Sequence, residues 1–125
     1  MTRDEKKPSG YRDLLVWQKG IALAKQIYEV TARFPSEEKY GLVSQMRRAA
    51  VSIPSNIAEG QARHTTGEFI QFISNAEGSV AELDTQLTLC EQFRFVEKGG
   101  AVELHEKLDE LRRMLNSLRR KLEAR

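Results

Sequence analysis

The sequence predicts an all-α protein, an antiparallel up-down-up-down four-helix bundle with left-handed packing. Three observations predict it. Apolar residues recur at helical spacing in four separate stretches, the connections between these stretches are short, and only 8 glycines and 3 prolines interrupt 125 residues. A content of 40% hydrophobic and 30% charged residues excludes a disordered chain. The longest apolar runs have four residues, whereas a membrane-spanning helix needs about 20, so no membrane partner is expected. We expect a flexible polar arm over residues 1–11 and one domain over 12–125.

The first helix is expected to begin at Asp13 and to end at the Phe34-Pro35 turn, because a residue before proline avoids helical geometry. It carries two adjacent apolar rows, wider than one bundle seam requires. The first row is Leu14, Trp17, Ile21, Ala24, Tyr28 and Thr31, and the second is Val16, Leu23, Ile27, Val30 and Phe34. Either the whole helix is buried, or one row faces the bundle and the other faces another subunit.

The second helix is expected over residues 37–59, with Ser36 as its N-cap and Gly60 at C′. Its core row is Val43, Met46, Ala50, Ile53 and Ile57. Pro54 lies inside the pattern, so we expect a kink or a local break there. A polar row runs beside the core row: Gln45, Ser52, Asn56 and Glu59. This row either supports packing around the kink, with Asn56 or Ser52 satisfying the freed backbone groups, or forms a functional groove.

The third helix is the clearest, because Thr65 and Glu68 form a capping box in front of a sustained heptad. That heptad is Phe69, Ile73, Ala76, Val80, Leu83, Leu87 and Cys90. A row of small residues, Ser74, Gly78 and Ala81, would let a neighbouring helix approach closely. After a loop over 94–100, the fourth helix carries a narrow seam: Ala101, Leu104, Leu108, Leu111, Leu115, Leu118 and Leu122.

Residues for catalysis or cofactor binding are scarce in this chain. Cys90 falls on a core position, and His64 and His105 are expected at the surface. No Glu-x-x-His pair, zinc-type spacing or glycine-rich phosphate loop is present, so we expect no metal, no cofactor and no enzymatic activity. A single cysteine and the absence of a secretory signal favour a cytoplasmic protein.

The net charge of +2 implies no partner, but its distribution is uneven. Residues 65–97 carry six acidic residues and one arginine, whereas residues 112–125 carry six basic residues and one glutamate. The basic side chains available for phosphate contact are Arg47, Arg48, Arg63, Arg112, Arg113, Arg119, Arg120 and Lys121. The alternative for the fourth helix is that its cations simply stabilise the helix dipole.

The stretch from Tyr40 to Gly60, which contains Ser-Ile-Pro-Ser-Asn-Ile-Ala-Glu-Gly, is not a generic helix sequence. It resembles the signature of the four-helix-bundle proteins encoded by intervening sequences in bacterial 23S ribosomal RNA genes. The opening Asp13-Leu-Leu-Val-Trp-Gln-Lys19, the Phe34-Pro35 turn and the Gly78-Ser-x-x-Glu-Leu83 pattern also match, so the resemblance covers residues 11 to about 122.

The resemblance implies a ring of five subunits with an open centre. It also implies kinship with the accessory variability-determinant protein of retroelements, a more basic ring that binds nucleic acid and works with a reverse transcriptase. We therefore expect a homo-oligomer, most simply a pentamer, that associates with RNA or the ribosome. The alternative is a scaffold or adaptor whose partner is another protein, such as a polymerase.

Overall fold

The computed structural model describes residues 10–125, and within them every regular element is helical. The four α-helices are α1 (Leu15–Thr31), α2 (Leu42–Gln61), α3 (Thr66–Gln92) and α4 (Val102–Glu123), with short 3₁₀ turns η2 (Tyr11–Asp13) and η3 (Ser36–Glu38). The prediction of an all-α protein with four helices is confirmed. The predicted arm lies mostly outside the described residues, while Tyr11 belongs to η2 and its ring packs at a tilt against that of Trp17.

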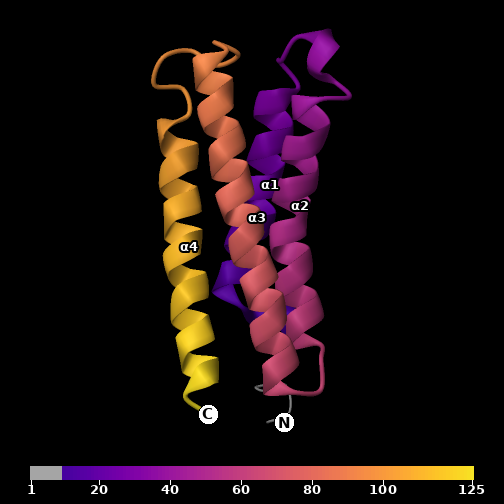
Figure 1. Cartoon of the computed structure of the whole chain (residues 1–125), viewed down its shortest axis with the longest axis vertical. Helices are drawn as coiled ribbons and strands as arrows, with labels where there is room; N and C mark the ends of the chain where they lie inside the picture. The colour runs from indigo at the N-terminus through magenta and orange to yellow at the C-terminus, as the bar shows by residue number, and fades with distance from the viewer. Residues whose placement is uncertain (1–9) are drawn as a thin grey trace.

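The four helices lie side by side (Figure 1). The α1–α2 and α3–α4 connections lie at one end of the bundle. The α2–α3 connection and the C-terminus of α4 lie at the other end, which we call the C-terminal end. None of the helices described is long and apolar enough to cross a membrane.

The apolar rows predicted for the bundle interior form the core. In α1 the second row is buried except for Val30, which is half-buried, and the core row of α2 is buried throughout. The α3 heptad is buried from Ile73 to Cys90, and α4 buries its leucines apart from the half-buried Leu118. Burial of these side chains supplies the main favourable term in folding. Cys90 is fully buried as predicted, and its Sγ lies 3.4 Å from the Sδ of Met46.

The first apolar row of α1 has a different environment. Thr31 is buried, but Ile21 and Tyr28 keep 46% and 44% of their surface exposed. The expectation of a wholly buried α1 is therefore wrong. One row of α1 faces the bundle, and part of the other lies on the molecular surface.

The start of α2 departs from the prediction. Ser36 begins the turn η3 and does not cap α2, which starts at Leu42 behind Gly41. Gly41 has φ −104° and ψ −110°, which is not helical, so the pattern that continues across it in sequence is interrupted in the backbone.

Gly60 is not a C′ residue, because it lies inside α2 and is buried against α3. A Cβ atom there would lie 2.7 Å from Phe72 Cβ and 2.9 Å from Phe69 Cδ1. The glycine therefore permits close helix packing rather than chain reversal.

Three further expectations concern α3 and the proline. The cap at Thr65 is confirmed, since its Oγ1 accepts a hydrogen bond from the Glu68 N–H at 3.1 Å. The small-residue row of Ser74, Gly78 and Ala81 faces outward, so none of the described helices packs on it. α2 runs through Pro54 without a break, and the predicted kink stays a prediction.

The polar row beside Pro54 makes its own hydrogen bonds. Asn56 Nδ2 donates to Ser52 O at 2.8 Å and to Ser52 Oγ at 2.9 Å. The carbonyl deprived of a donor by the proline is that of Ala50, four residues earlier, so the proposed rescue by Asn56 is wrong. The Ser52 hydroxyl instead meets the Ser79 hydroxyl of α3 at 2.8 Å.

Candidate nucleic-acid interface

Arg47 is committed to contacts between α1 and α2. Its Nε donates to Thr31 Oγ1 at 2.9 Å, and its Nη2 donates to the Tyr28 carbonyl at 3.2 Å. The guanidinium also lies 4.4 Å from the centre of the Tyr28 ring. A cation held by an acceptor pair and an aromatic face is poorly placed to reach a phosphate.

Three of the arginines of α4 are paired with carboxylates. Arg112 and Arg113 both form ion pairs with Asp109, and the hydrogen bond from Arg112 lowers the pKa of that carboxyl. Arg119 crosses to α3, where its Nε lies 3.0 Å from Glu77 Oε1, and it also pairs with Glu123. These contacts with Glu77 and Glu123 raise the pKa of Arg119.

The other four predicted cations have no ionic partner among the described residues. Arg48 reaches only the Ser44 hydroxyl, at 3.5 Å, and Arg63 lies 4.7 Å from the centre of the Phe72 ring. Arg120 and Lys121 are exposed at the end of α4. Arg63, Arg120 and Lys121 therefore share the C-terminal end of the bundle, whereas Arg48 lies elsewhere (Figure 1).

Arg125 extends this group, although the predicted set omitted it. It is exposed and follows the last turn of α4. We call Arg63, Arg120, Lys121 and Arg125 the basic end. The eight predicted residues thus do not form one surface, and the basic end gathers three of them.

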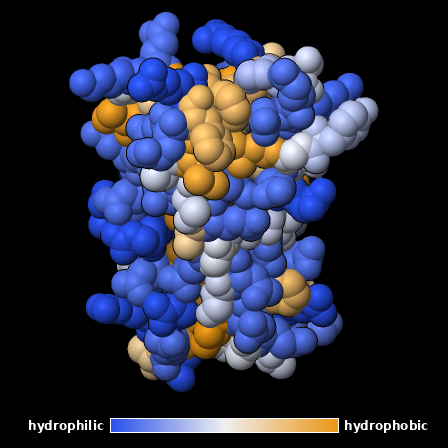
Figure 2. Space-filling view, turned by 45° about the horizontal axis from the view of Figure 1, so that its top comes forward, coloured by the Kyte–Doolittle hydropathy of each residue, from blue (hydrophilic) through white to orange (hydrophobic). Residues whose placement is uncertain are grey.

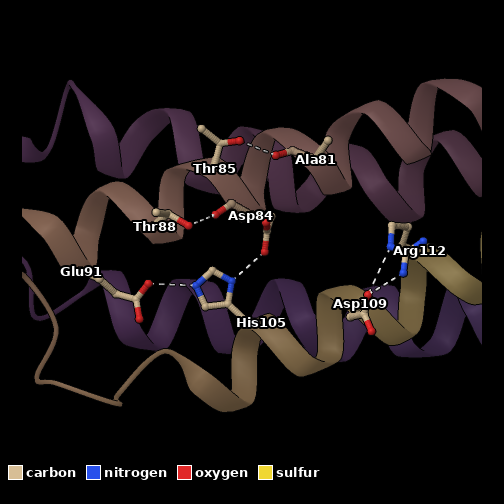
Figure 3. A network of polar contacts seen from close by, with 8 residues as sticks. All are labelled: Ala81, Asp84, Thr85, Thr88, Glu91, His105, Asp109 and Arg112. Carbon is tan, nitrogen blue, oxygen red and sulfur yellow. Dashed lines mark hydrogen bonds and ion pairs between the residues drawn. The ribbon is translucent and has the colours of Figure 1, made fainter.

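His105 makes the most developed polar contact between helices. Its Nδ1 lies 2.6 Å from Asp84 Oδ1 and its Nε2 lies 3.1 Å from Glu91 Oε1, so two carboxylates of α3 hold one imidazole of α4 (Figure 3). Burial alone would lower the pKa of His105, but the hydrogen bonds and charges of Asp84 and Glu91 outweigh it and raise that pKa.

This bridge was missed by the sequence interpretation, which placed His105 at the surface without a role. The available signal was the seven-residue spacing of Asp84 and Glu91, which puts both on one face of α3.

His64 is exposed in the α2–α3 connection. Burial, together with the nearby Glu38 and Glu91, raises the pKa of Cys90 to about 11, so this thiol is a poor nucleophile. No cluster of three or more metal-ligating side chains occurs in the described part of the chain.

Comparison with known proteins decides the family. The model of the 23S rRNA-intervening sequence protein family matches residues 12–117, most of the chain. The chain belongs to that family. No curated protein matches it.

A solved structure shares the fold of this family member. It is a protein of unknown function from the S23 ribosomal protein family of Bacteroides thetaiotaomicron, with a TM-score of 0.79 and 20% sequence identity. The alignment covers 85% of this chain and 96% of that chain. At this identity the likeness concerns the fold alone.

Proposed function

We propose that this protein is a non-enzymatic homo-oligomer that binds RNA, in association with the ribosome, through the basic end. The oligomer we propose is the pentamer implied by the family resemblance, built from antiparallel, left-handed bundles that bend at Pro54. The observation that carries the RNA-binding proposal is the set of four cations at one end of the bundle without carboxylate partners among residues 10–125.

Cations already paired with carboxylates contribute little to phosphate binding, because an ion pair must be broken before a new one forms. Arg120, Lys121 and Arg125 are free of this cost. One chain offers few simultaneous contacts. Several copies in one assembly would multiply them, and linked weak contacts raise the effective affinity.

Binding of this kind depends on salt and tolerates sequence changes, because backbone phosphates carry it. We would measure the affinity for a fluorescein-labelled, mixed-sequence RNA by anisotropy across a salt series. The slope of log affinity against log salt should fall by about 0.7–0.9 for each phosphate contact removed. The test variant is Arg120→Gln with Lys121→Gln.

The matched control is Arg112→Gln with Arg113→Gln, which removes the same charge from the same helix at two residues that share Asp109 as an ion-pair partner. We expect the test variant to flatten the slope by about 1.5 for each contacting subunit. The control should leave the slope nearly unchanged. Equal slopes for both variants would place the RNA site elsewhere, with Arg48 the next residue to test.

A second candidate function is a protein-binding scaffold or adaptor, such as an accessory subunit of a reverse transcriptase. It is favoured by apolar side chains exposed at the end opposite the basic end, where Figure 2 shows an apolar patch. Tyr40 and Phe93 keep 88% and 58% of their surface exposed there. Large exposed aromatic residues are typical of protein contacts. Absence of RNA binding even at low salt would favour this second function.

A further inference from the structure

A polar groove runs between α2 and α3, away from the basic end and from the His105 bridge. It encloses a cavity of about 380 Å³ lined by Gln45, Arg48, Ala49, Ser52 and Glu82. We call it the α2–α3 groove. Three of its lining residues come from the polar and small positions beside the α2 core row, for which no function has been assigned above.

A buried amide without a complete set of partners lies beneath this groove. Gln86 is only 5% exposed, its Nε2 donates to Glu82 Oε2 at 3.4 Å, and its Oε1 has no hydrogen-bond partner. The Ser52–Ser79 contact fixes the register of the two helices. In Figure 1, α2 and α3 run in opposite directions. Gln45 lies seven residues before Ser52 and Gln86 lies seven residues after Ser79, so these two residues are at the same height along the bundle axis.

The two walls of the groove carry opposite charges. Arg48 stands on the α2 wall and Glu82 on the α3 wall, and neither forms an ion pair within residues 10–125. One helical turn before Glu82, Gly78 is exposed, and a Cβ atom there would meet nothing within 4 Å. The groove therefore combines a rim without a side chain at Gly78 with a cation and a carboxylate that form no ion pair among residues 10–125.

A complementary surface exists on the outer face of α1. Ile21 and Tyr28 are bulky and nearly half exposed, and they form a ridge with the exposed Lys25 between them. Glu29, one turn after Lys25, is also exposed. No ion pair engages Lys25 or Glu29 in the described structure.

From this complementarity we infer that the α2–α3 groove receives the α1 ridge of a second copy of this chain. Lys25 of the incoming helix would pair with Glu82 and Glu29 with Arg48. The inference rests on the homo-oligomer of the proposed function and names its interface. The two surfaces differ, so the contact is head-to-tail, and such contacts generate closed rings when the rotation closes.

The sharpest test is Gly78→Gln, with the oligomeric state measured by light scattering and native mass spectrometry. The single chain has open space at this position, and replacing a glycine in a helix favours the helical backbone. The variant chain should therefore remain as helical as the unmodified protein. We expect its association to weaken by at least tenfold, because the new side chain fills the rim that the ridge needs.

A control and a charge-reversal pair keep the test specific. Ser117→Gln adds the same bulk to an exposed site on α4 and should leave the assembly intact. Arg48→Glu and Glu29→Arg should each weaken association, and the two together in one chain should restore it, since each groove then meets a reversed ridge.

The possible outcomes distinguish failure of the proposed homo-oligomer from failure of this interface. An unmodified protein that is monomeric overturns the proposed homo-oligomer and the interface with it. An oligomer that persists in Gly78→Gln, or whose two charge reversals fail to restore each other, overturns this interface alone.

Discussion

The α2–α3 pair and the α4 helix are held in the bundle by different means. α2 and α3 approach closely at Gly60, where a single added carbon would collide with Phe72, and they share a short hydroxyl contact between Ser52 and Ser79. α4 packs its leucine seam inward and is bridged to its neighbours by long charged side chains. The first contact depends on shape and the second also depends on protonation and ionic strength. The two regions should therefore respond to different perturbations.

The largest expected effect is on the shape-dependent pair. Gly60→Ala places a Cβ atom 2.7 Å from Phe72 Cβ, so the helices must separate or the ring must move. Overpacking of this kind costs about 1–3 kcal/mol. We expect the free energy of unfolding, measured by urea denaturation, to fall by that amount and to be insensitive to pH and salt.

Gly67→Ala is the matched control, because a Cβ atom there would meet nothing within 4 Å. Removing a glycine from open space in a helix is neutral or slightly stabilising. If Gly60→Ala were as stable as this control, the close approach of α2 and α3 would not be the feature that holds them together.

A smaller effect is expected on α4, and it should depend on pH. The folded-state pKa of His105 lies above its ordinary value, so its bridge to Asp84 and Glu91 stabilises the fold fully below about pH 6.5. That contribution is lost as the pH rises through the folded-state pKa. It should be about 1 kcal/mol or less, because the ring and both carboxylates are partly open to water.

The measurement is urea denaturation at several pH values between 5 and 9, with the unmodified protein, His105→Gln and His64→Gln. We expect His105→Gln to lose the part of the stability that declines with rising pH. His64→Gln should keep it, since His64 is exposed and no ion pair engages it in the described residues. A pH dependence that survives in His105→Gln would assign it to other groups.

Much of the fold follows from local patterns. The leucine seam of α4 and the α3 heptad predict which side of each helix is buried. Thr65 and Glu68 predict the start of α3, because the capping contact joins residues only three positions apart. The predictions that were wrong depend on contacts between helices. A glycine after a helical pattern can either end the helix or allow another helix to pack closely, and for Gly60 only the packing of α3 decides between these roles.

The candidate site was less predictable for the same reason. The sequence shows where the cations are, but not which of them are already held by side chains of other helices. Arg119 pairs with Glu77, 42 residues away, and Arg47 with Thr31, 16 residues away. Both partners lie on a different helix, so no spacing along one helix reveals them. Arg120 and Lys121 follow Arg119 directly in α4, yet both are exposed and neither forms an ion pair among the described residues.

The most direct test of the central claim is native mass spectrometry of the purified protein, with absorbance at 260 nm recorded on the same sample. The account predicts an assembly of several 14.3 kDa chains, five in the proposed ring, that carries RNA at low salt and releases it as salt is raised. A single 14.3 kDa species without nucleic acid at any salt concentration would contradict it.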